Sequence, residues 1–132
     1  MNAQWTGWLP CGATLAACVL LAACATTPAT APQWPKTVRG QNIAAYEIHE
    51  DCVRLRVGDR LDYEFTTNNP VDFNIHYHEG RTVLMPVVHD KSEQASGIFV
   101  PVIAQDYCLM WEAGPAGALL DYRINLRPPP PS

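Results

Sequence analysis

Apolar and polar residues alternate along three successive stretches of this chain, beginning just after Cys52. Successive side chains of a strand point to opposite faces, so a period of two predicts β-strands with one buried face. Turn residues separate the stretches at 58–59, 68–70 and 79–80. The apolar sets are Val53, Leu55 and Val57; Leu61, Tyr63 and Phe65; and Val71, Phe73, Ile75 and Tyr77.

The remaining segments fit the same pattern of short strands. Residues 83–88 are apolar on both faces and interrupted by Pro86, residues 89–96 predict a polar loop, and residues 98–104 and 107–111 are apolar runs. Leu120, Tyr122, Ile124 and Leu126 again alternate with polar residues. Since no stretch has a helical period, we predict an all-β fold over residues 43–127, a small antiparallel β-sandwich of jelly-roll type.

The first 23 residues predict a signal peptide. Residues 13–23, ATLAACVLLAA, match an apolar signal region and are shorter than the roughly 20 residues of a spanning helix. Residues 21–24, LAAC, are similar to the lipobox of bacterial lipoproteins. The resemblance implies that Cys24 is acylated and anchors the protein in the envelope, and Ala25 after it implies the outer membrane, facing the periplasm.

Two features depart from this interpretation. The segment before residue 11 has no Lys or Arg, and residues 15–18 form a second LAAC after a shorter apolar run. A buried Ala/Leu helix is the alternative for the same residues.

Low-complexity segments flank the predicted domain. Residues 24–42 are rich in Thr, Pro and Ala and predict a flexible, disordered tether, because such a composition buries little apolar surface. Residues 128–132 form a proline tail, which has too few donors to join a sheet.

The order of features resembles that of a GOLD domain, a small β-sandwich of trafficking and lipid-transfer proteins. The similar segments are CVRLRVGDRLDYEFTT, VDFNIHYHEG, DYCLMWEAG and LLDYRINL, within residues 46–127. The family often has Asn after the late aromatic residue, where this chain has Glu112 after Trp111. The resemblance implies a module that contacts proteins or lipids without a catalytic centre, and it transfers no site residue.

Two cysteines remain in the predicted domain. Cys52 and Cys108 each lie opposite the apolar set of their own strand, and disulfides persist in the envelope. We therefore predict a disulfide between them, with two free buried thiols as the alternative.

His76 and His78 share one face of a predicted strand, about 7 Å apart, a separation that suits two ligands of one metal ion. Met85 and Met110 could add soft ligands for copper or zinc, and Trp111 could cover a cuprous ion by cation–π contact. The alternative is a polar stripe that continues from Asp72 and Asn74, and we favour it, so no cofactor is expected. The list of candidate metal ligands is His76, His78, Met85 and Met110.

Charge and motifs narrow the function. A net charge of −4 argues against a nucleic-acid surface. His89, Asp90 and Ser92 offer triad residue types, but in one polar loop and without a nucleophile elbow, and Glu50 and Asp51 predict a solvated turn. We therefore predict an anchored, non-catalytic lipoprotein that binds or scaffolds a protein, lipid or envelope component, with a periplasmic metal-binding protein as the alternative.

Overall fold

Residues 33–129 are described by a computed structural model, and they form antiparallel β-structure, as the sequence predicted. Among these residues no helix is long and apolar enough to cross a membrane. The strands are β1 (Lys36–Ile43), β2 (Ile48–Leu55), β3 (Arg60–Glu79), β4 (Thr82–Phe99), β5 (Gln105–Ala113) and β6 (Ala118–Arg127).

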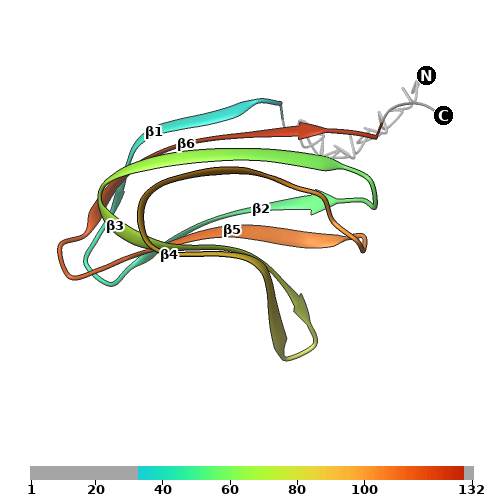
Figure 1. Cartoon of the computed structure of the whole chain (residues 1–132). Coiled ribbons are helices and arrows are strands. Elements are labelled where there is room, and N and C mark those ends of the chain that lie inside the picture. Colours follow the sequence, from blue (N-terminus) through green and yellow to red (C-terminus); the bar gives the residue numbers. More distant parts are fainter. Residues whose placement is uncertain (1–32, 130–132) are drawn as a thin grey trace, which may run out of the picture. The chain divides into compact units, whose positions relative to one another are not determined.

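The six strands belong to one strongly curled sheet with the order β1-β6-β3-β5-β2, and β4 pairs with β3. Residues 60–67 of β3 pair with β6, whereas residues 71–76 pair with β5. One side of β3 pairs with β6 and then with β5, while β4 pairs along its other side. Because of this change from β6 to β5, the sheet folds back on itself as a half-barrel (Figure 1). β1, β6 and the first half of β3 form its upper half in that view, and β2, β5 and the second half of β3 form its lower half.

The strand β3 bends where the sequence predicted a turn. Asn68, Asn69 and Pro70 lie inside this strand rather than between two strands. Asn68 Oδ1 accepts a hydrogen bond from the Leu119 amide at 2.7 Å, and Asn69 Nδ2 donates to the Gly117 carbonyl at 3.0 Å. These two side chains hydrogen-bond the backbone at the start of β6, where β3 stops pairing with that strand. Residues typical of a turn therefore produce a bend within β3.

Residues 89–96 are also strand, although their polarity predicted a loop. They belong to β4, which pairs with β3 and, among residues 33–129, with no other strand. An edge strand buries little of its surface and tolerates a proline, which explains both the polar run and Pro86.

The sheet begins earlier than predicted. β1 starts at Lys36, inside the segment interpreted as tether, because pairing with β6 orders it. Its alternation is hard to recognise, since only Ile43 is fully buried and the register shifts near Gly40, whose φ is +63°. The signal segment, Cys24 and residues 130–132 lie outside the described residues.

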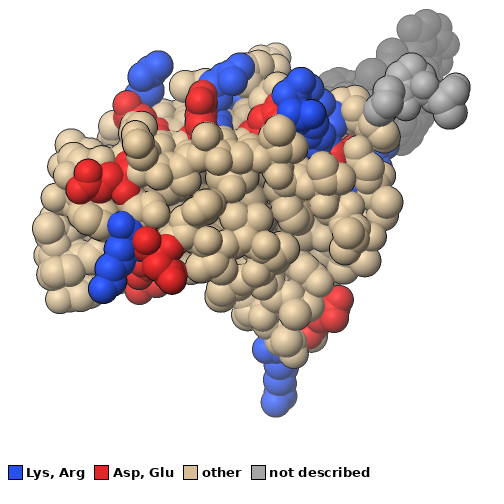
Figure 2. Space-filling view, in the orientation of Figure 1, with Lys and Arg blue, Asp and Glu red and all other residues tan. Residues whose placement is uncertain are grey.

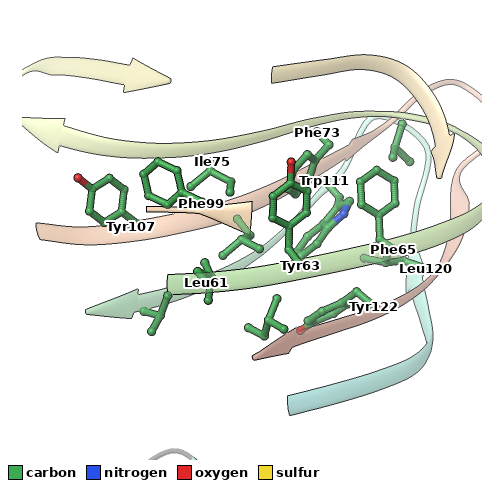
Figure 3. Packing of buried hydrophobic residues seen from close by; sticks show 14 of the residues in the cluster. Leu61, Tyr63, Phe65, Phe73, Ile75, Phe99, Tyr107, Trp111, Leu120 and Tyr122 are labelled. Carbon is green, nitrogen blue, oxygen red and sulfur yellow. The ribbon is translucent and has the colours of Figure 1, made fainter. Parts of the chain in front are cut away.

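The core lies between the two halves of the half-barrel. The alternating residues of β3 and β6 point inward as predicted, whereas Val57, in a turn, is 61% exposed. Trp111 lies at the centre, with ring centroids 5.3 Å from Phe73 and 4.6 Å from Tyr122. Figure 3 shows the rings of Tyr63, Phe65, Phe73 and Trp111 converging between the strands.

Candidate functional site

The outer face of the lower half brings together most of the residues singled out in the sequence. Strand register aligns Cys52 with Cys108 and Cys108 with His76 across β2, β5 and β3. The neighbouring row aligns Glu50, Met110 and Asn74. We call these six residues the outer-face cluster: Glu50, Cys52, Asn74, His76, Cys108 and Met110.

The predicted disulfide is confirmed. Cys52 and Cys108 are bonded, with their Cα atoms 4.0 Å apart on neighbouring strands. Cys52 is exposed, whereas Cys108 is 9% exposed. Both lie on the face opposite the buried Val53 and Leu109, as the alternation predicted.

His76 is the most enclosed polar side chain of this cluster, only 4% exposed. Its Nδ1 lies 2.8 Å from Asn74 Oδ1, and its Nε2 lies 3.2 Å from Glu50 Oε1. An amide oxygen only accepts, so Nδ1 carries the proton and donates it to Asn74. When the ring is neutral, the lone pair of Nε2 faces the Glu50 carboxylate.

The electrostatic environment favours that neutral ring. Burial lowers the pKa of His76 below its usual value; the Glu50 carboxylate acts in the opposite direction, and His78 lowers this pKa further. Burial has the larger effect, so the net shift of the His76 pKa is downward.

Stability is expected to fall as the pH drops from about 7 to about 5. The folded-state pKa of His76 is lowered from 6.5, as is that of His49, so the unfolded chain takes up protons first. These contributions to the free energy of unfolding are therefore present above pH 6.5 and lost as the pH falls through it, levelling off below the folded-state pKa. Urea unfolding across this range measures the effect, and His76→Gln and His49→Gln should each flatten the pH dependence. An unchanged slope in the double variant would contradict the assignment.

The other predicted ligands lie beside His76 without joining the same close group. His78 is exposed, and its ring centroid is 5.2 Å from that of His76. Ile75 pairs with Val87 and Tyr77 with Leu84, so Met85 and Pro86 oppose His76 in a bulge. Met110 occupies the row between Glu50 and Asn74, as described above.

Glu50 is the residue that sequence reasoning missed. It was interpreted with Asp51 as a solvated turn, but both lie in β2, where alternation sends them to opposite faces. A usable signal existed, since Glu50 precedes Cys52 by two residues and therefore shares its face. Within residues 33–129, one atom each from Glu50, His76 and Cys108 lie within 4.8 Å of one another, an arrangement compatible with a metal ion.

Asp51 instead connects β2 to β1 and β6 through side-chain contacts. Lys36 Nζ lies 2.6 Å from Asp51 Oδ2, and the Tyr122 hydroxyl donates to the same oxygen at 2.7 Å. His49 Nε2 lies 3.3 Å from that hydroxyl. Burial raises the pKa of Tyr122, and the Asp51 carboxylate raises it further. The hydroxyl therefore stays protonated, and its hydrogen bond to Asp51 connects β6 to β2.

Two further sequence ideas are corrected by the geometry. Trp111 is 1% exposed on the inner face, the opposite side of the sheet from His76, so it does not cover that imidazole. His89 points toward the core, where its Nε2 lies 3.1 Å from the Tyr63 hydroxyl and its ring stacks on Phe73.

A second candidate site lies along β4 and the loop that follows it. Of the ten exposed large hydrophobic side chains in the described part of the chain, six fall between residues 83 and 102. They are Val83, Met85, Val88, Ile98, Val100 and Val102.

Comparison with known proteins adds no relative: no family model matches the chain, and no curated protein matches its sequence.

Proposed function

We propose that this protein is an envelope lipoprotein whose half-barrel is a non-catalytic binding module, and that β4 is its binding edge for a protein partner. The observation that carries the proposal is the concentration of exposed apolar side chains on an edge strand and the loop that follows it. On β4, Ile98 is 55% exposed, Val88 51% and Met85 50%, and Val102 in the loop that follows is 83% exposed.

The backbone of β4 supports a strand as the ligand. Among residues 33–129 it pairs with β3 alone, so one side of an 18-residue strand offers free amide and carbonyl groups. Exposed edges of this kind bind extended segments by adding a strand, with side-chain contacts giving specificity. The occupant is therefore an extended segment of a partner protein whose apolar side chains contact those of β4.

The charge distribution fits an apolar partner segment. Figure 2 shows charged side chains along the upper border, at the left and on the lower projection, while the middle of this face is largely uncharged. Exposed apolar side chains that gather in one part of a surface are typical of an interaction site.

Anchoring is the second part of the proposal. The lipobox-like LAAC supports acylation of Cys24, and the outer membrane facing the periplasm is the proposed location. A jelly-roll or GOLD-like sandwich is the finer fold that we propose, because the curled sheet has two halves facing each other across one core.

A photoreactive amino acid placed at Val88 or Ile98 in the full chain is expected to crosslink to one protein of discrete mass in cells. Matched control positions are Leu119 on β6, which is 50% exposed, and Ile48 on β2, which is 53% exposed. They should give at least about tenfold less product, since binding is confined to one patch. Mass spectrometry of the crosslinked peptide identifies the partner segment.

Equal crosslinking from all four positions, or products that contain only lipid, would contradict the proposal. Adding Cys24→Ser to the same strains tests anchoring independently of partner binding. In them the protein should move from the membrane to the soluble fraction and still crosslink to the purified partner.

A further inference from the structure

We infer that the Cys52–Cys108 disulfide masks a zinc site, and that reducing it gives Zn²⁺ four ligands: both thiolates, His76 Nε2 and the Glu50 carboxylate. The inference starts from the three atoms of Glu50, His76 and Cys108 that lie within 4.8 Å of one another. Cys52 joins them because it is bonded to Cys108.

The separation of His76 and Glu50 suits two ligands of one metal ion. With Nδ1 donating to Asn74, Nε2 faces a Glu50 carboxylate oxygen 3.2 Å away. Tetrahedral zinc with bonds of about 2.0–2.1 Å to nitrogen and oxygen puts these two atoms about 3.3 Å apart, close to the observed separation.

Asn74 supplies the support that metal-binding histidines use. An imidazole that ligates through one nitrogen typically donates the other N–H to an oxygen, which fixes its tautomer and orientation. Asn74 is 6% exposed, so this hydrogen bond is shielded from water and held by the strand.

The β2–β5 ladder keeps the two sulfur atoms together after reduction. The strands pair from Ile48 with Glu112 through Leu55 with Gln105, on both sides of the cysteines. The thiols therefore remain neighbours when the covalent bond is gone. Two thiolates, one imidazole and one carboxylate are a donor set that zinc accepts in tetrahedral geometry.

The redox step needs a dithiol reductant. Its thiolate attacks the sulfur of Cys52, which is exposed, and Cys108 leaves as a thiolate. The second thiolate of the reductant then releases Cys52, so the reductant becomes a disulfide and the protein gains two electrons and two protons. Zn²⁺ displaces both thiol protons when it binds.

The test is a Zn²⁺ titration of the full chain in detergent, with Cys11→Ser, Cys18→Ser and Cys24→Ser, so that only Cys52 and Cys108 supply sulfur. The reduced chain is expected to bind one Zn²⁺ at least about 100-fold more tightly than the oxidised chain, because two thiolates are added. Co²⁺ in place of Zn²⁺ should give sulfur-to-metal charge-transfer absorption only in the reduced form.

Variants locate the remaining ligands. Glu50→Gln and His76→Ala should each weaken Zn²⁺ binding by the reduced chain, and Asn74→Ala should weaken it by about 10–100-fold. His78→Ala is the matched control, a histidine on the same face outside the close group, and should leave the affinity within about twofold.

Thermal unfolding separates a folded site from thiols of an unfolded chain. Zn²⁺ should raise the Tm of the reduced protein and leave that of the oxidised protein unchanged, because a ligand of the native state stabilises it. Equal affinity in both redox states, binding indifferent to Glu50→Gln and His76→Ala, or a Tm lowered by Zn²⁺ would each overturn the inference.

Discussion

Replacing Cys52 and Cys108 together by alanine is expected to lower the free energy of unfolding by about 4 kcal/mol. The disulfide closes a separation of 56 residues, which removes conformational freedom chiefly from the unfolded chain. Almost nothing is expected to change in the folded sheet, because β2 and β5 remain paired from Ile48 to Leu55. Urea unfolding of both proteins under oxidising conditions measures the difference.

The matched control is the wild-type chain in a dithiol reductant, with metal ions removed by a chelator. It should lose a similar amount of stability, because the double variant and the reduced chain share the same missing crosslink. A loss below about 1 kcal/mol in both would show that the unfolded chain gains little freedom, contrary to the chain-entropy account.

Trp111→Ala is expected to lower the free energy of unfolding by about 3–5 kcal/mol. The indole is 1% exposed and contacts Phe65, Phe73 and Tyr122 between the two halves of the sheet. Removing it leaves a cavity at the point where β3 and β5 are held against β6. Thermal and urea unfolding, followed by circular dichroism, measure the loss.

Trp111→Phe separates packing from hydrogen bonding. The indole Nε1 has no hydrogen-bond partner within the described residues, so phenylalanine removes no such bond and retains much of the ring contact. We expect it to cost less than half of what alanine costs. Similar losses for both variants would contradict a packing role.

Local alternation was enough to predict much of β2, β3 and β6 and the faces that they bury. Leu61, Tyr63 and Phe65 point inward because each lies two residues from the next, a relation that needs no knowledge of the partner strand. The disulfide was predictable for the same reason, since it required only that Cys52 and Cys108 share the outer side of their strands.

The curl of the sheet was beyond such local reasoning. Residues 68–70 have the composition of a turn, and whether they reverse the chain or bend it depends on β5 and β6, strands that come much later. The polar run in β4 was misread for a similar reason, because an edge strand lacks the second neighbour that would bury its residues.

The candidate metal site also depends partly on local spacing and partly on strand pairing. His76 could be proposed from its spacing with His78, a local relation along one strand. The spacing of Glu50 and Cys52 shows only that they share a face, because the contact of Glu50 with His76 depends on the register of β2 with β5 and of β5 with β3. A site assembled across three strands is a property of the pairing, which a single sequence does not display.

Hydrogen exchange on the complex with the crosslinked partner tests the binding edge most directly. The account predicts that backbone amides of residues 82–99 exchange more slowly in the complex than in the free protein, since an added strand supplies their missing acceptors. Amides of β1 should exchange at the same rate in both. Unchanged exchange along β4, with protection at another surface, would contradict the account.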